Sequence, residues 1–124
     1  MLVVVRKDQP KIAMGLLSYL PRLHDVASVQ REIDWYQASD AREILLWQST
    51  ETQHYVAVLG VEAVFDSIVL RLVVFGPEVP VTSRIAVGSE IYEAMKLRYP
   101  DKTIGGTIST QPILTEWRKY LHNG

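Results

Sequence analysis

The segment TSRIAVGSEIYEAM, residues 82–95, carries the groups best suited to binding an anion. It reads as a short polar loop, then a turn of small residues, then an amphipathic helix. Unpaired N–H groups and the helix dipole make a helix start a place where phosphates bind. Ala86 and Gly88 are small enough to let a phosphate approach the backbone, and Arg84 adds a cation. The alternative is an ordinary helix start whose small residues serve close packing.

Two charged residues interrupt the apolar runs and could take part in chemistry. Glu62 lies in such a run, where burial would disfavour the charged form of a carboxylate. A carboxylate of this kind is better suited to act as a general base near neutral pH. A solvated, outward-facing Glu62 is the plainer interpretation. Arg71 interrupts the next run and could face an anion of a cofactor or substrate, or simply the solvent. The three histidines share no ligand spacing, so no metal site is expected.

The composition limits the classes of partner. A chain of 124 residues is expected to form a single domain, 1–124. Its 13 basic and 14 acidic residues give a net charge of -1, so neither nucleic acid nor a membrane is expected as a main partner. The chain has no cysteine, which excludes disulfides and suits a reducing cytoplasm, the location that we expect.

The elements that must position these residues are expected in the order β-α-α-β-β-β-α-β-α. Strands are predicted from β-branched and apolar runs at 2–6, 42–49, 54–65, 67–75 and 102–110. Helices are predicted from apolar spacing at 11–20, 24–37, 85–99 and 112–121. The connections TETQ and DS are short enough to join the three central strands into an antiparallel meander. Gly60, inside the middle strand, indicates a bulge or a close backbone approach.

This order and the segment at 82–95 resemble the Gcn5-related N-acetyltransferase (GNAT) family. Members bind acetyl-CoA through the signature Gln/Arg-x-x-Gly-x-Gly/Ala, which here falls on SRIAVG, with Ser83 in the first position and Ala86 in the fourth. The resemblance implies an α+β domain with a mixed, mostly antiparallel sheet flanked by helices, without the last strands of larger members. It places acetyl-CoA contacts at Ser83, Arg84, Ile85, Ala86, Val87, Gly88 and Ser89.

Two further family features have counterparts in this chain. The end of the fourth strand pairs with pantetheine in the family, a role that would fall on Val73, Val74 and Phe75. The last family motif resembles TQPILTEWRKYLH, but Trp117 replaces the tyrosine that protonates the leaving thiolate in many members. An indole cannot act as a general acid. Tyr120, on the same helix face, could substitute, or it could be a core tyrosine.

The stretches KIAMGLLSYLP, LLW and VLGVE are similar to the RibT branch of the family, small bacterial proteins linked to riboflavin operons. The resemblance implies transfer of an acetyl group from acetyl-CoA to an unidentified amine without a metal. A main-chain N–H near Val74 would polarise the carbonyl. Glu62 or water would accept the proton of the amine, and Tyr120 or solvent would protonate the thiolate.

Other functions remain open from the sequence. The domain could bind CoA without catalysis, as a sensor or assembly module, because the signature is degenerate and Trp117 replaces the tyrosine. It could also be an interaction domain with no small ligand. The absent strands would leave one sheet edge open, which favours a homodimer.

Overall fold

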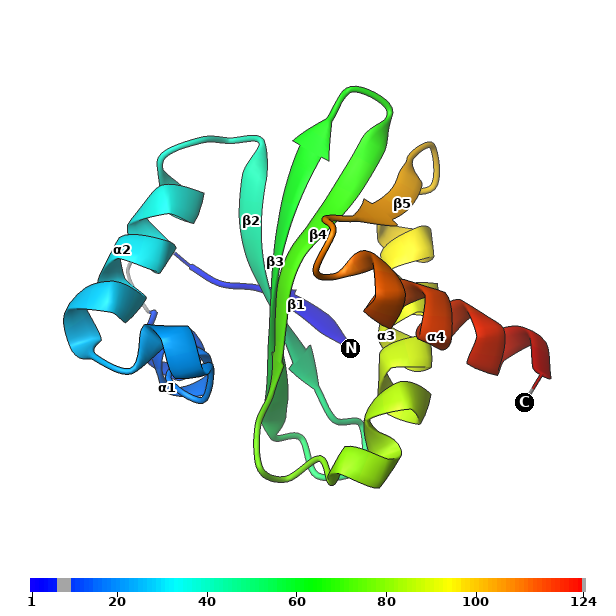
Figure 1. Cartoon of the computed structure of the whole chain (residues 1–124), viewed down its shortest axis with the longest axis horizontal. Coiled ribbons are helices and arrows are strands. Elements are labelled where there is room, and N and C mark those ends of the chain that lie inside the picture. The colour runs from blue at the N-terminus through cyan, green and yellow to red at the C-terminus, as the bar shows by residue number, and fades with distance from the viewer. Residues whose placement is uncertain (7–9, 124) are drawn as a thin grey trace.

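In the computed structural model, which describes residues 1–6 and 10–123, one five-stranded sheet separates two pairs of helices (Figure 1). The strands are β1 (Leu2–Val4), β2 (Arg42–Gln48), β3 (Tyr55–Val64), β4 (Ser67–Phe75) and β5 (Thr103–Gly106). The helices are α1 (Lys11–Leu17), α2 (Val26–Gln37), α3 (Arg84–Arg98) and α4 (Gln111–Asn123). Two short 3-10 helices, η1 (Pro21–Leu23) and η2 (Val81–Ser83), precede α2 and α3. The predicted element order and the α+β class are confirmed.

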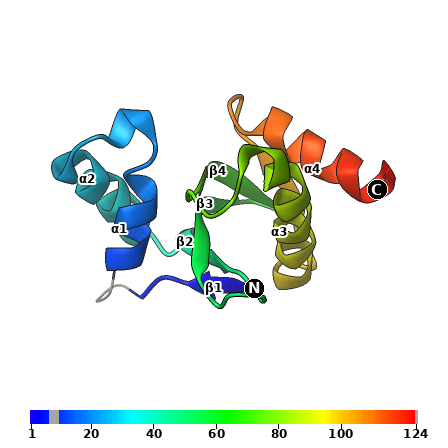
Figure 2. The same ribbon diagram turned by 90° about the horizontal axis from the view of Figure 1, so that it is seen from below.

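The sheet has the order β1-β2-β3-β4-β5, and all neighbours are antiparallel except β4 and β5. The strands β2, β3 and β4 form the expected meander. The chain then crosses over through α3 so that β5 can run parallel to β4, as a parallel pair requires. Helices α1 and α2 cover one face of the sheet, and α3 and α4 cover the other (Figure 2).

β3 lies at the centre of the sheet and is buried on both faces. Val58 points into the core under α1 and α2, and Leu59 points into the core under α3 and α4. Successive side chains of a strand point to opposite faces, so an apolar run such as VAVLGV supplies both cores at once. This double burial fixes the position of β4, the neighbour of β3 that carries the candidate site.

The bulge and the close approach that Gly60 indicates are both confirmed. The register between β3 and β4 shifts between Gly60 and Val61. A Cβ atom at Gly60 would overlap the phenol of Tyr36, which packs down from α2. Glycine is therefore the residue that lets the Tyr36 ring lie directly on the β3 backbone. Burial also raises the pKa of the Tyr36 phenol, so this group stays protonated at neutral pH.

The last strand is shorter than the expected range 102–110, because the chain turns after Gly106. The backbone N–H of Thr107 donates to Oγ1 of Thr110 at 2.8 Å, and the N–H of Thr110 donates back to Oγ1 of Thr107 at 3.2 Å. These bonds close a turn that leads directly into α4. Within the described part of the chain, no helix is long and apolar enough to cross a membrane.

Candidate functional site

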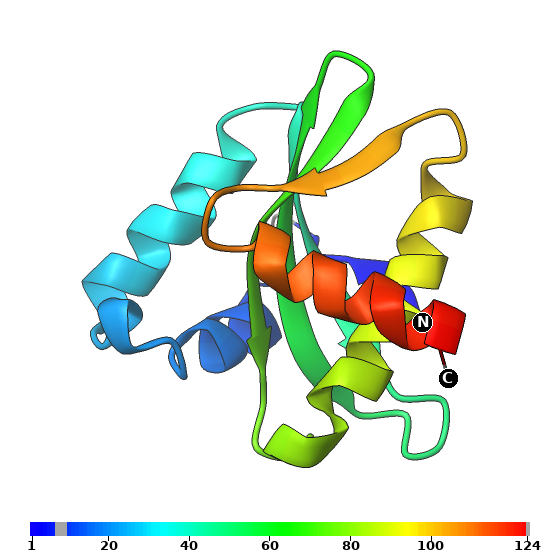
Figure 3. The same ribbon diagram turned by 45° about the vertical axis from the view of Figure 1, so that its right-hand side comes forward.

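β4 has a free edge along its second half. It pairs with β5 only from Ser67 to Leu70, so no strand of the described residues lies beside Arg71–Phe75 on that side. Figure 3 shows β5 diverging from β4, with the connection from β5 to α4 lying beside β4. The two parallel strands therefore open a gap at the surface next to α3 and α4.

A cleft of about 600 Å³ lies along this free edge. Its walls come from the turn after α1, the free half of β4, the start of α3 and one face of α4. The lining residues are Tyr19, Leu20, Pro21, Val73, Val74, Phe75, Pro77, Arg84, Ile85, Ile113, Glu116 and Trp117. The lining is mostly apolar, with Arg84 and Glu116 as its charged side chains. A mostly apolar ligand with an anionic group near Arg84 would suit this lining.

The backbone of the free edge presents hydrogen-bonding groups to the cleft. The N–H of Gly76 donates to the carbonyl of Val56 on β3 at 2.8 Å. Hydrogen-bonded pairs alternate along an antiparallel ladder, so Val74, opposite Val58, also directs its N–H to β3. Val73 and Phe75 belong to the other set, and their N–H and C=O groups point toward the cleft. These two residues, rather than Val74, can pair with a ligand through the main chain.

Thr110 holds the point at which β4 and β5 part. Its side chain is 4% exposed, and its hydroxyl donates to the carbonyl of Leu70 at 2.5 Å. Leu70 is the last β4 residue paired with β5, so this bond ties the start of α4 to the end of the pairing. Gly106 lies so close that a Cβ there would overlap Oγ1 of Thr110. From the sequence, Thr110 only takes the Asn position of the last family motif, and its contact with Leu70 was not predicted.

The segment expected to cradle a phosphate is helical rather than a loop. The N–H of Ser83 donates to the carbonyl of Pro80 at 2.9 Å, and the N–H of Arg84 donates to Val81. η2 therefore runs directly into α3, and the first helical N–H groups are those of Val81 and Thr82. An anion at this helix start would meet the backbone there, one turn earlier than the sequence indicates.

Arg84 lies between the helix start and the cleft. Its Nε donates to the carbonyl of Val79 at 3.3 Å, and its guanidinium carbon lies 5.7 Å from the ring centroid of Phe75. These contacts hold the Arg84 side chain beside Phe75, and Arg84 is one of the two charged residues that line the cleft. Ile85, exposed beside it, forms part of the same wall.

The other residues of the segment point elsewhere. Ser83 and Val87 border a second hollow, on the far side of η2. Ala86 is half-buried, and Ser89 is buried with its hydroxyl donating to the carbonyl of Ala86 at 2.6 Å. Gly88 packs against α4, where a Cβ would overlap the indole of Trp117. The small size of Gly88 thus serves the packing of two helices.

Trp117 forms a wall of the cleft and part of the core. It is 2% exposed and meets Phe75 edge to face, with ring centroids 6.4 Å apart. Tyr120 lies one turn further along α4 and is 46% exposed. Ile113, Glu116 and Tyr120 follow one another at helical spacing, so Tyr120 continues the row that faces the cleft, at its outer end.

Glu62 belongs to a cluster on the face of the sheet that α1 and α2 cover, next to α2. We define the arginine cluster as Trp35, Arg42, Glu62 and Arg71. Oε1 of Glu62 lies 3.2 Å from Arg71, and Oε2 lies 3.5 Å from Nε of Arg42. Both carboxylate oxygens are therefore engaged by cations, and only 21% of the side chain is exposed.

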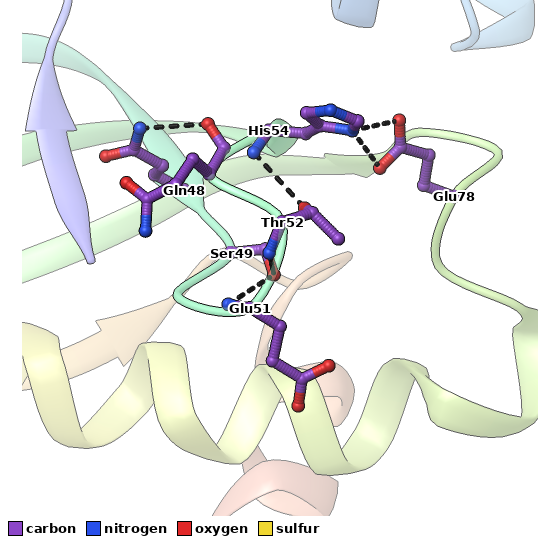
Figure 4. Close-up of polar contacts among 7 residues, drawn as sticks. Gln48, Ser49, Glu51, Thr52, His54 and Glu78 are labelled. Carbon is purple, nitrogen blue, oxygen red and sulfur yellow. Dashed lines mark hydrogen bonds and ion pairs between the residues drawn. The ribbon is translucent and has the colours of Figure 1, made fainter.

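The second hollow, of about 590 Å³, lies between the β2–β3 connection and the loop after β4. Nδ1 of His54 lies 2.9 and 3.1 Å from the two carboxylate oxygens of Glu78. This contact joins the two loops (Figure 4). Among the described residues, no group of three or more histidine, aspartate or glutamate side chains is arranged to hold a metal ion.

A mixed five-stranded sheet whose fourth and fifth strands diverge beside a helix start is the fold of the Gcn5-related N-acetyltransferases. The aminoglycoside antibiotic 6'-N-acetyltransferase AAC(6')-Ih from Acinetobacter baumannii matches it with a TM-score of 0.63 at 13% identity, over 100% of this chain and 89% of that one. AAC(6')-Iy, in complex with the bisubstrate analogue CoA-S-monomethyl-acetylneamine, matches with a TM-score of 0.64 at 8% identity, over 99% and 88%.

The sequence comparison points the same way. The chain is 28% identical over 105 residues to an uncharacterised N-acetyltransferase in the lysA 3' region of Bacillus methanolicus. The match covers 84% of this chain and 83% of that protein. No family model matches the chain.

Proposed function

We propose that this protein is an N-acetyltransferase that moves an acetyl group from acetyl-CoA to an amine. The observation that carries the proposal is the apolar cleft along the free edge of β4, which reaches Arg84 and Ile85 at the start of α3. The relative from Bacillus methanolicus is named an N-acetyltransferase, and one structure of the same fold contains a CoA analogue. Both names support the same reaction class.

The cleft and the helix start suit different parts of acetyl-CoA. The pantetheine arm, which carries amide groups, would lie along β4 and pair with the main chain of Val73 and Phe75. The pyrophosphate would lie at the first N–H groups of the helix, Val81 and Thr82, with Arg84 supplying the countercharge. The rest of the segment from Ser83 to Ser89 would shape this end of the site, because Gly88 sets how closely α4 approaches.

The reaction would be a direct attack, without a covalent enzyme intermediate. The nitrogen of the amine forms a bond to the carbonyl carbon of the thioester, and the bond from that carbon to sulfur breaks. The nitrogen loses a proton, and the leaving thiolate gains one. A main-chain N–H of the free β4 edge, at Val73, would polarise the carbonyl oxygen as negative charge develops there.

Glu62 and Tyr120 remain the proposed proton carriers. Ion pairs with Arg42 and Arg71 hold both carboxylate oxygens of Glu62, so Glu62 would accept the proton of the amine through a bound water molecule. Tyr120 continues the cleft-facing row of α4 and would reach the thiolate only through solvent.

The finer identity is also part of the proposal. The resemblance to the RibT branch supports a bacterial, cytoplasmic enzyme linked to riboflavin operons. The outer edge of β5 has no strand beside it among the described residues, which supports pairing with a second copy. A CoA-binding sensor or assembly domain is the alternative, and the names of the relatives favour the enzyme over it.

Calorimetric titration with acetyl-CoA, followed by an assay of thiol release with a panel of amines, tests the proposal. We expect binding that Arg84→Ala weakens about tenfold, because one charge-assisted contact is lost. Arg31→Ala, an exposed arginine on α2, should leave the affinity unchanged. Glu62→Gln should lower turnover far more than it lowers affinity for acetyl-CoA. Absence of binding would overturn the proposal, and binding without thiol release would favour the sensor.

A further inference from the structure

Arg71 is a residue of β4 that is paired with neither neighbouring strand. The last pair between β4 and β5 joins Leu70 to Gly106, so Arg71 is the first residue past the point where these strands part. On the other side, Leu70 pairs with Val61 and Leu72 pairs with Gly60, so Arg71 has no partner on β3. A bulge of this kind redirects a side chain, and here it directs Arg71 toward Trp35 on α2.

The same position corresponds to the reacting end of the proposed site. The anion end of the cleft is at the start of the η2–α3 helix, beyond Phe75. Arg71 precedes Phe75 by four residues, about 13 Å along a strand at 3.3 Å per residue. A CoA arm that runs along β4 away from its phosphates would therefore carry its thioester toward Arg71. The acceptor amine must approach that thioester, so it must also approach Arg71.

The arginine cluster carries more positive than negative charge. It holds two guanidinium groups, Arg42 and Arg71, but one carboxylate, Glu62. Arg42 also donates to the carbonyl of Trp35 at 3.0 Å, which fixes it within the structure. The neighbouring pair of Arg22 and Glu32 is balanced by itself. One positive charge is therefore left over where the acceptor would bind.

Arg71 is the arginine of this cluster that can reach a ligand. Its side chain is 40% exposed, against 24% for Arg42. Its guanidinium carbon lies 4.8 Å from the ring centroid of Trp35, which supports it from one side. One terminal nitrogen donates to Glu62, and the planar fork keeps further N–H donors for a carboxylate or phosphate.

We infer that the acceptor is a primary amine that carries an anionic group, a carboxylate or a phosphate, and that Arg71 binds this group. The inference rests on the proposed acetyl transfer, whose acceptor it defines. The positive cluster would repel a polycationic acceptor such as a polyamine. It would also favour the neutral form of the attacking amine, which is the form that can react with the thioester.

Thiol release from acetyl-CoA with matched amines tests this inference. Phosphoethanolamine is compared with ethanolamine, and γ-aminobutyrate with putrescine. We expect kcat/KM to be about ten- to a hundredfold higher for the anionic member of each pair, as a charge-assisted hydrogen bond provides. Arg71→Gln should remove this preference, so that kcat/KM becomes about equal within each pair, while KM for acetyl-CoA stays unchanged. Arg31→Gln is the matched control and should keep the preference.

A higher kcat/KM for putrescine, or an anion preference that survives Arg71→Gln, would overturn the inference while leaving the acetyl transfer intact. If no amine releases thiol, the acetyl transfer fails, and calorimetry still decides the inference. Phosphoethanolamine and γ-aminobutyrate are then titrated into the CoA-saturated protein. Binding that Arg71→Gln abolishes supports an anion site at Arg71. Absent binding, or equal binding to the variant, overturns it.

Discussion

Two glycines within helices differ in what a side chain would meet. Gly88 in α3 faces the indole of Trp117, and a Cβ there would overlap the ring. For Gly15 in α1, no described residue beyond its chain neighbours and its own helix backbone has an atom within 4 Å of that position. A substitution at Gly88 therefore disturbs the contact between α3 and α4 first, and any contact with CoA only second.

Gly88→Ala and Gly15→Ala should therefore change the free energy of unfolding in opposite directions. Gly88→Ala should lower it by about 1–3 kcal/mol, because Trp117 must move in a close-packed core. Gly15→Ala should raise it by about 0.5–1 kcal/mol, since alanine loses less backbone entropy in a helix. Urea unfolding measures both. Equal effects of the two substitutions would contradict the close contact at Gly88.

The start of α2 depends on one carboxylate and gives a prediction about pH. Oδ1 of Asp25 accepts from the N–H of Ser28 at 2.6 Å, and this bond holds the pKa of Asp25 below its ordinary value of 3.8. A lowered pKa in the folded state means that the stabilisation is complete above the ordinary value. It is lost as the pH falls through the lower, folded pKa.

Asp25→Ala should accordingly lower the melting temperature at pH 7, and the difference from the wild type should shrink as the pH falls below about 4. Asp101→Ala, at an exposed turn residue, should show little difference at either pH. Thermal unfolding between pH 7 and pH 2.5 follows both variants. A gap for Asp25→Ala that stays constant over this range would be inconsistent with a charged N-cap.

At the scale of elements, the separation of β4 and β5 is the feature on which the site depends. Thr110 holds it with a single buried hydroxyl, which donates to Leu70 and accepts from Thr107. The bond links the last paired residue of β4 to the first turn of α4. Two walls of the cleft, β4 and α4, are thereby held together by one side chain.

Thr110→Val should remove these bonds and leave the carbonyl of Leu70 buried without a donor. We expect a loss of about 1–3 kcal/mol in the free energy of unfolding, together with weaker binding of acetyl-CoA. Thr110→Ser keeps the hydroxyl and should retain most of both. Urea unfolding and calorimetry measure the two effects. If Val and Ser behaved alike, the hydroxyl would not be what holds the strands apart at this point.

At the scale of the whole molecule, the element order could be predicted because helix and strand periods are local. The meander followed from two short connections, and the bulge at Gly60 followed from a glycine in an apolar strand. Arg84 could be assigned to the start of a helix because the helical pattern begins at the next residue. These inferences needed only neighbours in the sequence.

The remaining site features depend on contacts between distant segments. Arg42, Glu62 and Arg71 meet because the register of three strands brings them together, and Arg71 is exposed by a bulge that its partner strand defines. The role of Gly88 depends on Trp117 from another helix. Short-range patterns carry no information about register, so these residues were visible in the sequence but their partners were not.

The central claim is that CoA lies along the free edge of β4. Amide hydrogen exchange, followed residue by residue by NMR with and without CoA, tests it most directly. The account predicts that CoA slows exchange at Val73 and Phe75, whose N–H groups face the cleft, and changes little at Val74, which already bonds to β3. Unchanged exchange at Val73 and Phe75, or slowing confined to the second hollow around residues 49–52, would contradict it.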